Sequence, residues 1–467
     1  MHDLAPEAWW RKRRLQDVVT ELIGSFGYRC LETPILEPTE LFLRKSGGEL
    51  ASRLYSFTDN GSNSVSLRPE FTSPIMRHYL EHAAGIELPA RWQYAGPVFR
   101  FEIAAPKASG QFTQVGAELL GADSIMADAE VLSLAALIPS HLGLADWRLV
   151  LGDLDVLGSI LDTVGVSERA RAFIVSSMPQ LREGRQAVPR VLERAHGFRL
   201  GGRGGEDDYL GQAVQGLDDS QARVVLQGLL QWTAADQLGQ RDPGEVVDRL
   251  LRKLKGTDDE TRLLRGLELG AELAAVEGEP GAALDAAGAV VREAGANRAA
   301  LDRLAQTLDL LLDGPGLGGH LALNFGLMRE LAYYNGIVFE ITHPEWSGSL
   351  GGGGRYDALA RALGSPEPLP ALGFAFNLEA LLALTEAATV AVASLSARLE
   401  TLVVAADSES CRQALEATLE LHRQGLPAEL DVAGRNLAQA LAYATSKGMA
   451  QVVIVNRDGA HVAHPVE

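Results

Sequence analysis

The spacing of apolar residues divides most of the chain into helical and extended segments. Apolar residues recur at helical spacing from Leu15 to Ile23 and stop at Gly27, which predicts a helix over 15–26. A second helix is predicted over 126–142, and others begin near 38 and 378. Short apolar runs between turn residues predict strands at 28–36 (broken by Pro34), 64–67, 90–101, 112–120, 147–151, 321–325, 336–341 and 373–376. We expect 112–120 to pair antiparallel with 97–102, which gives an α+β core with an antiparallel sheet.

Two further regions have different patterns. From about 156 to 312 the chain is rich in Leu, Ala and Arg at helical spacing, which predicts a mainly helical insertion. After a linker at 387–396, strands (401–406, 428–431, 451–455) alternate with helices (410–424, 436–447), as in a small α/β domain. The predicted domains are therefore a core in two parts, 1–155 and 321–386, an insertion at 156–320 and a C-terminal domain at 397–467.

Composition narrows the possible functions. The 467 residues carry a formal charge of −19, which argues against a broad nucleic-acid surface and makes tRNA an unexpected partner. The basic run 11–14 predicts a solvated helix start. Only Cys30 and Cys411 occur, so there is no disulfide or zinc spacing, and a reducing cytoplasm is expected. The apolar stretch 380–393 is too short to span a bilayer. The histidine spacing predicts no metal site, and no cofactor is expected. The glycine run 351–354 is not followed by the Gly-Lys-Ser/Thr of a P-loop, so it predicts a turn beside a ligand pocket.

Polar residues on the core segments are candidates for one binding site. A sheet face with two carboxylates, an arginine and several tyrosines suits a zwitterion that carries a polar ring, because each charged end meets its opposite and the ring finds hydrogen-bond partners. Taken alone, each of these residues is more simply explained as a surface or sheet-edge polar group whose hydrogen bonds are satisfied. The whole set in this order favours a binding site. The candidates are Glu70, Thr72, Gln114, Glu118, Arg329, Tyr333, Tyr334 and Tyr356.

Several fragments carry a family resemblance. They are Leu67–Glu70 (LRPE), Phe99–Glu102 (FRFE), Gln111–Glu118 (QFTQVGAE), 329–340 (RELAYYNGIVFE) and 352–357 (GGGRYD). In this order the chain resembles the histidyl-tRNA synthetases of class II and, more closely, their paralogue, the regulatory subunit of ATP phosphoribosyltransferase. The resemblance implies a class II synthetase-like core, a homodimer through 27–37 and a truncated anticodon-binding-like C-terminal domain.

The resemblance also implies roles for individual residues. Glu70, Thr72 and Gln114 would contact the α-amino group of histidine, Glu118 and Tyr334 the imidazole, and Arg329 the carboxylate. Arg100, Glu102 and Phe112 would form a residual nucleotide site.

Two departures from the family pattern shape the functional prediction. Ala380 stands where the resemblance places an arginine that holds ATP, and the loop 103–110 has one cation, Lys107. Because adenylation depends on charge stabilisation of its leaving group, the sequence predicts no catalytic residues and no enzyme activity.

The prediction is a non-catalytic regulatory subunit for the first step of histidine biosynthesis. Its expected partners are the short-form phosphoribosyltransferase catalytic subunit and histidine as an effector, with the homodimer inside a hetero-oligomer. Two alternatives stay open: a divergent histidyl-tRNA synthetase that activates histidine with ATP and transfers it to tRNA, and a synthetase-like paralogue that acts as another ligase or sensor.

Overall fold

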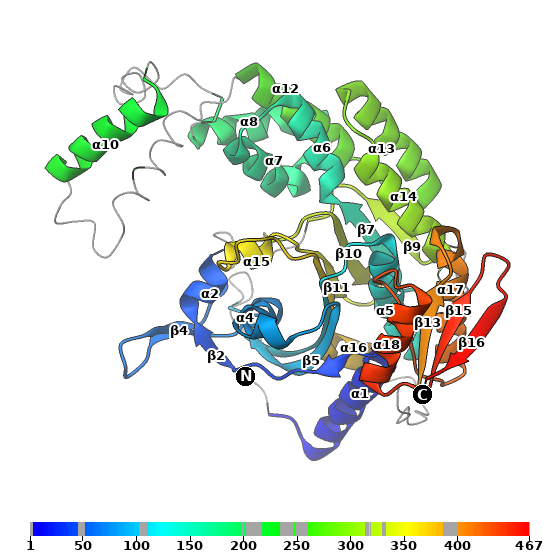
Figure 1. Cartoon of the computed structure of the whole chain (residues 1–467). Coiled ribbons are helices and arrows are strands. Elements are labelled where there is room, and N and C mark those ends of the chain that lie inside the picture. Colours follow the sequence, from blue (N-terminus) through cyan, green and yellow to red (C-terminus); the bar gives the residue numbers. More distant parts are fainter. Residues whose placement is uncertain are drawn as a thin grey trace. The chain divides into compact units, whose positions relative to one another are not determined.

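The computed structural model describes most of the chain in two units (Figure 1). The described residues are 3–44, 52–101, 110–198, 200–201, 217–233, 247, 260–312, 317, 319–328, 333–385 and 400–466. The first unit comprises 1–155, 278–284 and 299–467, and the second comprises 156–277 and 285–298. No described helix is long and apolar enough to cross a membrane.

The first unit is built on a nine-stranded sheet. Its order is β1-β5-β6-β12-β11-β10-β7-β9-β8. The strands are β1 (Arg29–Cys30), β5 (Ala90–Phe99), β6 (Gln111–Leu120), β7 (Arg148–Asp153), β8 (Glu277–Gly278), β9 (Leu321–Asn324), β10 (Ile337–Thr342), β11 (Ser349–Arg355) and β12 (Ala371–Asn377). Neighbours from β5 to β7 pair antiparallel, whereas β1 and β9 pair parallel to β5 and β7. The predicted fold class is confirmed, and the sheet as a whole is mixed.

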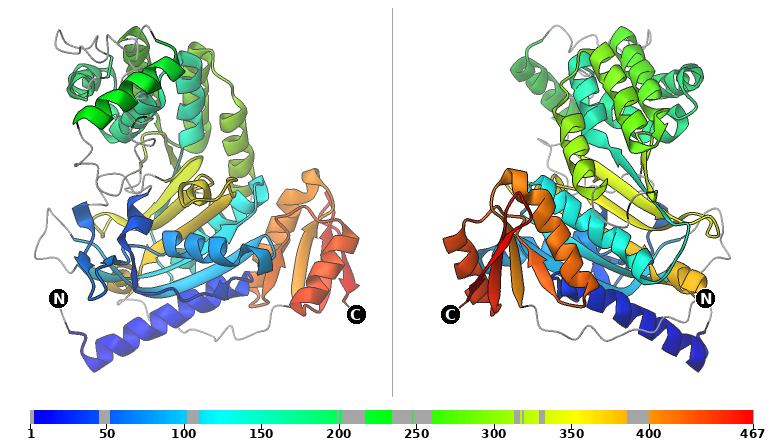
Figure 2. Two further views of the ribbon diagram at one scale, coloured as in Figure 1. Left: turned by 60° about the vertical axis from the view of Figure 1, so that its left-hand side comes forward. Right: turned by 90° about the vertical axis from the view of Figure 1, so that its right-hand side faces the viewer.

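Helices cover both faces of this sheet. Three of them, α1 (Pro6–Ser25), α5 (Ile125–His141) and α16 (Leu378–Thr385), pack on β5, β6 and β12, and Figure 2 shows α1 running along the sheet. The opposite face carries α4 (Thr72–His82), η1 (Ala83–Gly85) and α15 (Leu359–Ala362). Its apolar cluster includes Phe71, Met76, Tyr94 and Leu359. Seven of the candidate residues that the structure describes line a pocket on this second face.

A small antiparallel sheet flanks the large one. It has the order β2-β4-β3, with β2 (Leu36–Pro38), β4 (Ser64–Leu67) and β3 (Ser56–Thr58), and α2 (Thr39–Leu43) follows β2. The break predicted at Pro34 within the segment 28–36 is present: β1 and β2 lie on either side of it and belong to different sheets. Pro34 has no N–H to donate, and the Thr33 carbonyl accepts a hydrogen bond of 2.6 Å from Arg68 Nη1 instead of a strand partner.

The C-terminal part is the predicted α/β arrangement with one additional strand. Its sheet has the order β14-β13-β15-β16, with β13 (Thr401–Ala405), β14 (Ala428–Leu430), β15 (Gln451–Val455) and β16 (His461–Pro465). Its helices are η3 (Ser408–Ser410), α17 (Cys411–Arg423) and α18 (Leu437–Lys447), and Asn436 and Gln439 form a capping box at the start of α18. The predicted pattern lacks β16 because that edge strand is largely exposed and does not alternate.

The second unit is helical. The described helices from 154 to 312 are α6 (Leu154–Val164), α7 (Glu168–Leu181), η2 (Arg185–Ala187), α8 (Val188–Gly197), α10 (Asp219–Thr233), α12 (Glu260–Ala274), α13 (Pro280–Ala294) and α14 (Ala299–Leu312). Of these, α14 belongs to the first unit, and α13 crosses the division. Close packing of α7 on α12 uses a glycine, since a Cβ at Gly266 would lie 3.0 Å from Ile174 Cδ1. The linker predicted at 387–396 lies outside the described residues.

The glycine run 351–354 corrects another expectation. These residues were predicted to form a turn beside the ligand pocket, but they form most of β11 in the centre of the sheet. The physical reason is the close approach of β12, because a Cβ at Gly353 would lie only 1.9 Å from the Gly373 carbonyl oxygen. Only glycine fits this position without displacing a backbone.

We therefore predict that Gly353→Ala destabilises the protein. Because the clash is with backbone, the cost should reach about 1–3 kcal/mol, seen as a lower urea midpoint. Gly281→Ala is the control: a Cβ there meets nothing within 4 Å, and Gly281 lies in helix α13. That variant should be neutral or slightly more stable. Equal midpoints for the two variants would contradict this account of β11.

Candidate functional site

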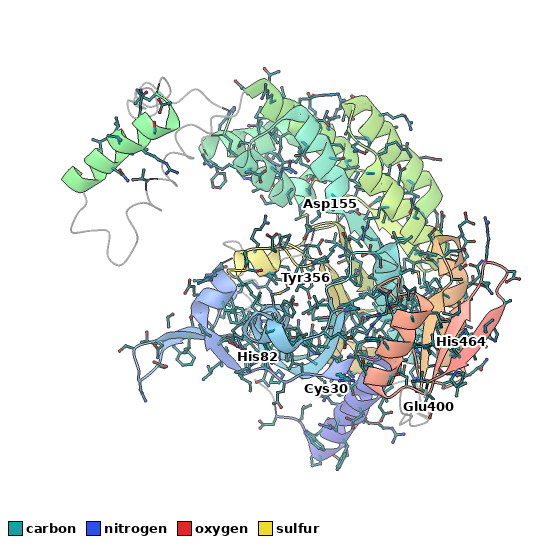
Figure 3. All side chains as sticks on the ribbon, in the orientation of Figure 1. Cys30, His82, Asp155, Tyr356, Glu400 and His464 are labelled. Atoms are coloured by element: carbon teal, nitrogen blue, oxygen red, sulfur yellow. The ribbon has the colours of Figure 1, made fainter. Side chains whose placement is uncertain are left out.

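A pocket on the α4 side of the large sheet brings most of the candidate residues together. The free space within it, including open solvent at its mouth, is about 330 Å³. Of the predicted residues, Glu70, Thr72, Arg100, Gln114, Tyr333, Tyr334 and Tyr356 line it, with Tyr94, Gly352, Gly373, Phe374 and Ala375. They come from the start of α4, from β5, β6, β11 and β12, and from adjoining loops; Tyr356, labelled in Figure 3, directly follows β11. Residues as far apart in sequence as Glu70 and Ala375 thus share one pocket.

Glu118 does not line the pocket itself but is buried against three residues that do, Thr72, Tyr94 and Tyr356. Its Oε1 accepts hydrogen bonds from Thr72 Oγ1 at 2.7 Å and from the Tyr94 hydroxyl at 3.2 Å. Its Oε2 accepts one from the Tyr356 hydroxyl at 2.5 Å. Burial, together with the nearby carboxylate of Glu70, raises the pKa of Glu118 to about 8, against the lowering effect of these hydrogen bonds. Glu118 is therefore largely protonated at neutral pH when the pocket holds no ligand.

Glycines on the facing strands make room for this carboxyl group. Gly373 on β12 is the register partner of Glu118 on β6. A Cβ at Gly373 would lie 1.6 Å from Glu118 Oε2 and 2.6 Å from the Ala117 carbonyl oxygen. Gly116 likewise makes room for Tyr94, because a Cβ added at Gly116 would lie 2.8 Å from the Tyr94 hydroxyl oxygen.

Glu70 lies at the start of α4. The Ser73 N–H donates to both carboxylate oxygens of Glu70, at 3.1 Å each. A carboxylate suits this position because the N-terminal end of a helix carries partial positive charge. Burial nevertheless raises the pKa of Glu70. Thr72 is the first residue of α4, and its hydroxyl donates to Glu118 on β6, so it lies at a helix start beside the sheet.

Two buried polar atoms face the pocket without a partner. Among the described residues, neither Gln114 Oε1 nor the Tyr333 hydroxyl has a hydrogen-bond partner of acceptable geometry. Tyr333 packs against Tyr334 and Tyr356, with ring centroids 4.9 and 5.7 Å apart. A buried polar atom without a partner costs free energy, so such atoms in a pocket suit hydrogen bonds to a polar ligand.

Sequence reasoning missed two residues of the site. Tyr94 donates to Glu118 and stacks on Phe71, with centroids 4.3 Å apart. Arg355 is buried behind the pocket, where its Nε donates to Asp128 Oδ1 at 3.1 Å and its Nη1 to Asp357 Oδ1 at 3.2 Å. This ion pair fixes the backbone that carries Tyr356. Both residues were within quoted or predicted segments, but their spacing alone did not distinguish them from core residues.

The expected nucleotide contacts are only partly described. Arg100 lies over the ring of Phe112, 5.3 Å from its centroid, and its Nε donates to the Pro69 carbonyl at 2.9 Å. Ala380 is fully buried in the first turn of α16. Arg329 and Glu102, which were predicted to contact the histidine carboxylate and the nucleotide, lie outside the described residues. Within the described part of the chain, no group of three or more His, Cys, Asp or Glu could hold a metal ion.

Comparisons with known proteins identify the family. The family model described as histidyl-tRNA synthetase matches residues 1–184 and 234–381, which is more than half of the chain. The chain belongs to the histidyl-tRNA synthetase family. A histidine–tRNA ligase of Thermococcus kodakarensis is 29% identical over 458 residues, covering 97% of this chain and 89% of the relative. One from Methanocaldococcus jannaschii is 27% identical, covering 97% and 90%.

Solved structures support the same fold. A Bacillus halodurans protein titled an ATP phosphoribosyltransferase regulatory subunit/histidyl-tRNA synthetase has a TM-score of 0.56 at 20% identity, covering 98% of this chain and 97% of that one. A histidine–tRNA ligase subunit from Alicyclobacillus acidocaldarius has a TM-score of 0.50 at 23% identity, covering 83% and 96%. At these identities the similarity shows the fold alone.

The curated relatives correct the functional prediction. The regulatory, non-catalytic interpretation rested on Ala380 and the cation-poor loop 103–110. Eight relatives that are 26–29% identical over nearly the whole chain are all named histidine–tRNA ligase, which is the name of an enzyme. The interpretation as a non-enzyme is therefore wrong, and the phosphoribosyltransferase partner that came with it is withdrawn. Two changed positions carried too much weight against a similarity that extends over the whole chain.

The ionisation of Glu118 gives a test of the site. Its pKa is about 8 when folded, against an ordinary value of 4.5, so the folded state binds the proton more tightly. Its contribution to stability is fully present below pH 4.5 and is lost as the pH rises towards 8. Glu118→Gln does not titrate, and its free energy of unfolding should therefore rise relative to wild type across this window, measured by urea unfolding at a series of pH values.

The control for this measurement is Glu279→Gln, which changes an exposed glutamate. Its stability should follow the wild-type pH dependence. A Glu118→Gln curve parallel to wild type between pH 4.5 and 8 would show that Glu118 ionises normally.

Proposed function

We propose that this chain is a histidine–tRNA ligase, which activates histidine with ATP and transfers it to tRNA. The observation that carries the proposal is the pocket in which Glu70, Gln114 and Tyr356 converge around the buried Glu118. A zwitterion with a polar ring suits this set of side chains. The names of the relatives across nearly the whole chain support the same activity.

In this proposal the two carboxyl groups have different tasks. Glu70, buried at the start of α4, receives the cationic α-amino group together with the open Oε1 of Gln114. Glu118 meets the imidazole. Because its pKa is about 8, both of its forms are accessible near neutral pH: the carboxylate accepts from a ring N–H, and the acid donates to a ring nitrogen. Arg329 remains a predicted contact of the histidine carboxylate.

The nucleotide is placed beside Arg100 and Phe112. The Phe112 ring offers one face to adenine, and Arg100 supplies a cation close to it. Ala380 cannot supply the second cation that the resemblance places there, and a cation–π contact is worth about 0.5–2 kcal/mol. We therefore expect ATP to bind more weakly than it would with an arginine at 380, with the chemistry retained.

The reaction balances as two displacements. A carboxylate oxygen of histidine attacks the α-phosphorus of ATP, and the bond from that phosphorus to the oxygen bridging to the β-phosphate breaks, which releases pyrophosphate. A terminal hydroxyl of tRNA then attacks the carbonyl carbon of the adenylate, and AMP leaves. The pocket contributes by holding histidine in a fixed orientation, which can account for a large part of such a rate enhancement.

Histidine-dependent ATP–pyrophosphate exchange tests the proposal. The purified chain should catalyse exchange that requires histidine. Glu70→Gln should lower kcat/KM for histidine about tenfold or more, because a charge-assisted contact with the amino group is lost. Glu279→Gln, an exposed control, should match wild type. A folded wild-type chain without exchange would refute the proposed activity.

Gln114 gives a separate test of the amino-acid contact. Gln114→Met keeps the volume but removes the unpartnered acceptor, so KM for histidine should rise roughly 10- to 100-fold. The free energy of unfolding should stay constant or increase, because a buried atom without a partner has been removed. A variant with unchanged KM, or one whose loss of activity follows a loss of stability, would contradict this role.

The predicted homodimer is retained as part of the proposal. Ile35 and Leu36, within the segment 27–37, are 44% and 49% exposed, and Phe57 on β3 is 48% exposed. Large apolar side chains exposed close together on a small sheet suit a protein interface.

A further inference from the structure

The start of α1 combines exposed aromatic rings with consecutive cations. Trp9 is 48% exposed and Trp10 is 66% exposed, and their ring centroids are 4.8 Å apart at an interplanar angle of 80°. Arg11, Lys12, Arg13 and Arg14 follow directly. Exposed tryptophan side chains are unusual in a folded protein, because burial of their large rings removes much apolar surface from water.

The arrangement on the helix separates this surface from the core. The apolar residues from Leu15 to Ile23 pack inward on the large sheet. Trp10, Arg13 and Arg14 are three and four residues apart, so they are neighbours on the other side of the helix, and all three are exposed. Arg13 pairs with Asp17 at 3.1 Å, but such exposed pairs are weak and leave the arginine able to bind another anion.

Lys12 fixes the position of this helix start. Its Nζ lies 2.7 Å from Glu379 Oε1 on α16, and Glu379 Oε2 accepts a hydrogen bond of 2.8 Å from the Thr113 N–H on β6. Gln114, which lines the pocket, is the next residue on that strand. The exposed rings and cations therefore stand on a helix anchored to the sheet that carries the candidate site.

We infer that the surface formed by Trp9, Trp10, Arg11, Arg13 and Arg14 binds an RNA strand. The arginines can bind its phosphates, and the tryptophan rings can stack on an unpaired base. Proteins that bind single-stranded nucleic acid combine these two kinds of contact. Although the chain carries a net charge of −19, this cluster of cations forms a locally positive surface, and the phosphates of an RNA strand complement it electrostatically. Identifying this RNA as tRNA rests on the proposed function.

A membrane surface fits this region less well. A helix that lies in a bilayer interface needs a continuous apolar face, and the apolar face of α1 is already packed on the protein. Beyond that face, the large apolar side chains exposed on the described part of this segment are Leu4 and the two tryptophans.

The test is filter binding of unfractionated tRNA to the full chain over roughly 50–200 mM salt. Trp10→Ala should weaken binding about tenfold or more, because a stacked base is lost. The double variant Arg13→Gln with Arg14→Gln should reduce the magnitude of the salt slope by about 1.5, because two phosphate contacts are lost. Lys12 is left unchanged because it anchors the helix.

The matched control is the double variant Arg148→Gln with Arg361→Gln, which removes two exposed arginines elsewhere in the first unit. Its tRNA affinity should stay close to wild type. Equal effects of the two double variants, or no effect of Trp10→Ala, would overturn the inference. It would also be overturned if the α1 variants lost binding to phosphatidylserine vesicles while binding tRNA normally.

Histidine-dependent pyrophosphate exchange separates this inference from the proposed function, because exchange requires no tRNA. The α1 variants should exchange like wild type. An inactive wild-type chain whose tRNA binding still depends on Trp10 would refute the ligase activity and leave the RNA surface standing. A chain that catalyses exchange but binds tRNA equally well with and without the α1 substitutions would support the ligase activity and refute the RNA surface.

Discussion

The structure of the site depends on one buried carboxyl group. Glu118 joins three distant segments, because it accepts hydrogen bonds from Thr72 on α4, Tyr94 on β5 and Tyr356 after β11. In water such bonds would contribute little, but in a buried pocket an unsatisfied carboxyl group is costly, and the three hydroxyls therefore hold their elements in place. The same burial raises the pKa of Glu118 to about 8, which lets the group serve both as structure and as a recognition element.

Space for that carboxyl group comes from the backbone of the facing strands. Gly373 leaves that space, since a Cβ there would lie 1.6 Å from Glu118 Oε2. Gly353 is required for a different reason, the close approach of β12 to β11, because a Cβ there would lie 1.9 Å from the Gly373 carbonyl oxygen. One glycine thus accommodates the buried carboxyl group, and the other allows two central strands to pack.

The polar residues that remain around the pocket explain why the prediction of a non-catalytic protein was wrong. Ala380 and the loop 103–110 removed expected cations, and we judged the chemistry from those positions. The proposed histidine pocket keeps Glu70, Gln114 and the tyrosines together against the buried Glu118, and Arg100 remains beside Phe112. A lost contact of a few kcal/mol can weaken nucleotide binding without changing the reaction, because binding energy is spread over many groups.

The sequence by itself determined the elements whose signals are local. Helix α5, strands β4, β5 and β6 and the alternation of the C-terminal part follow from apolar spacing, and the quoted fragments located most pocket residues. Tertiary structure decided the rest. The run 351–354 is a strand because β12 approaches it, Thr72 begins a helix that the sequence pattern did not predict, and the pKa of Glu118 is raised because its carboxyl group is buried. Periodicity is a property of neighbouring residues, whereas burial and close approach depend on partners hundreds of positions away.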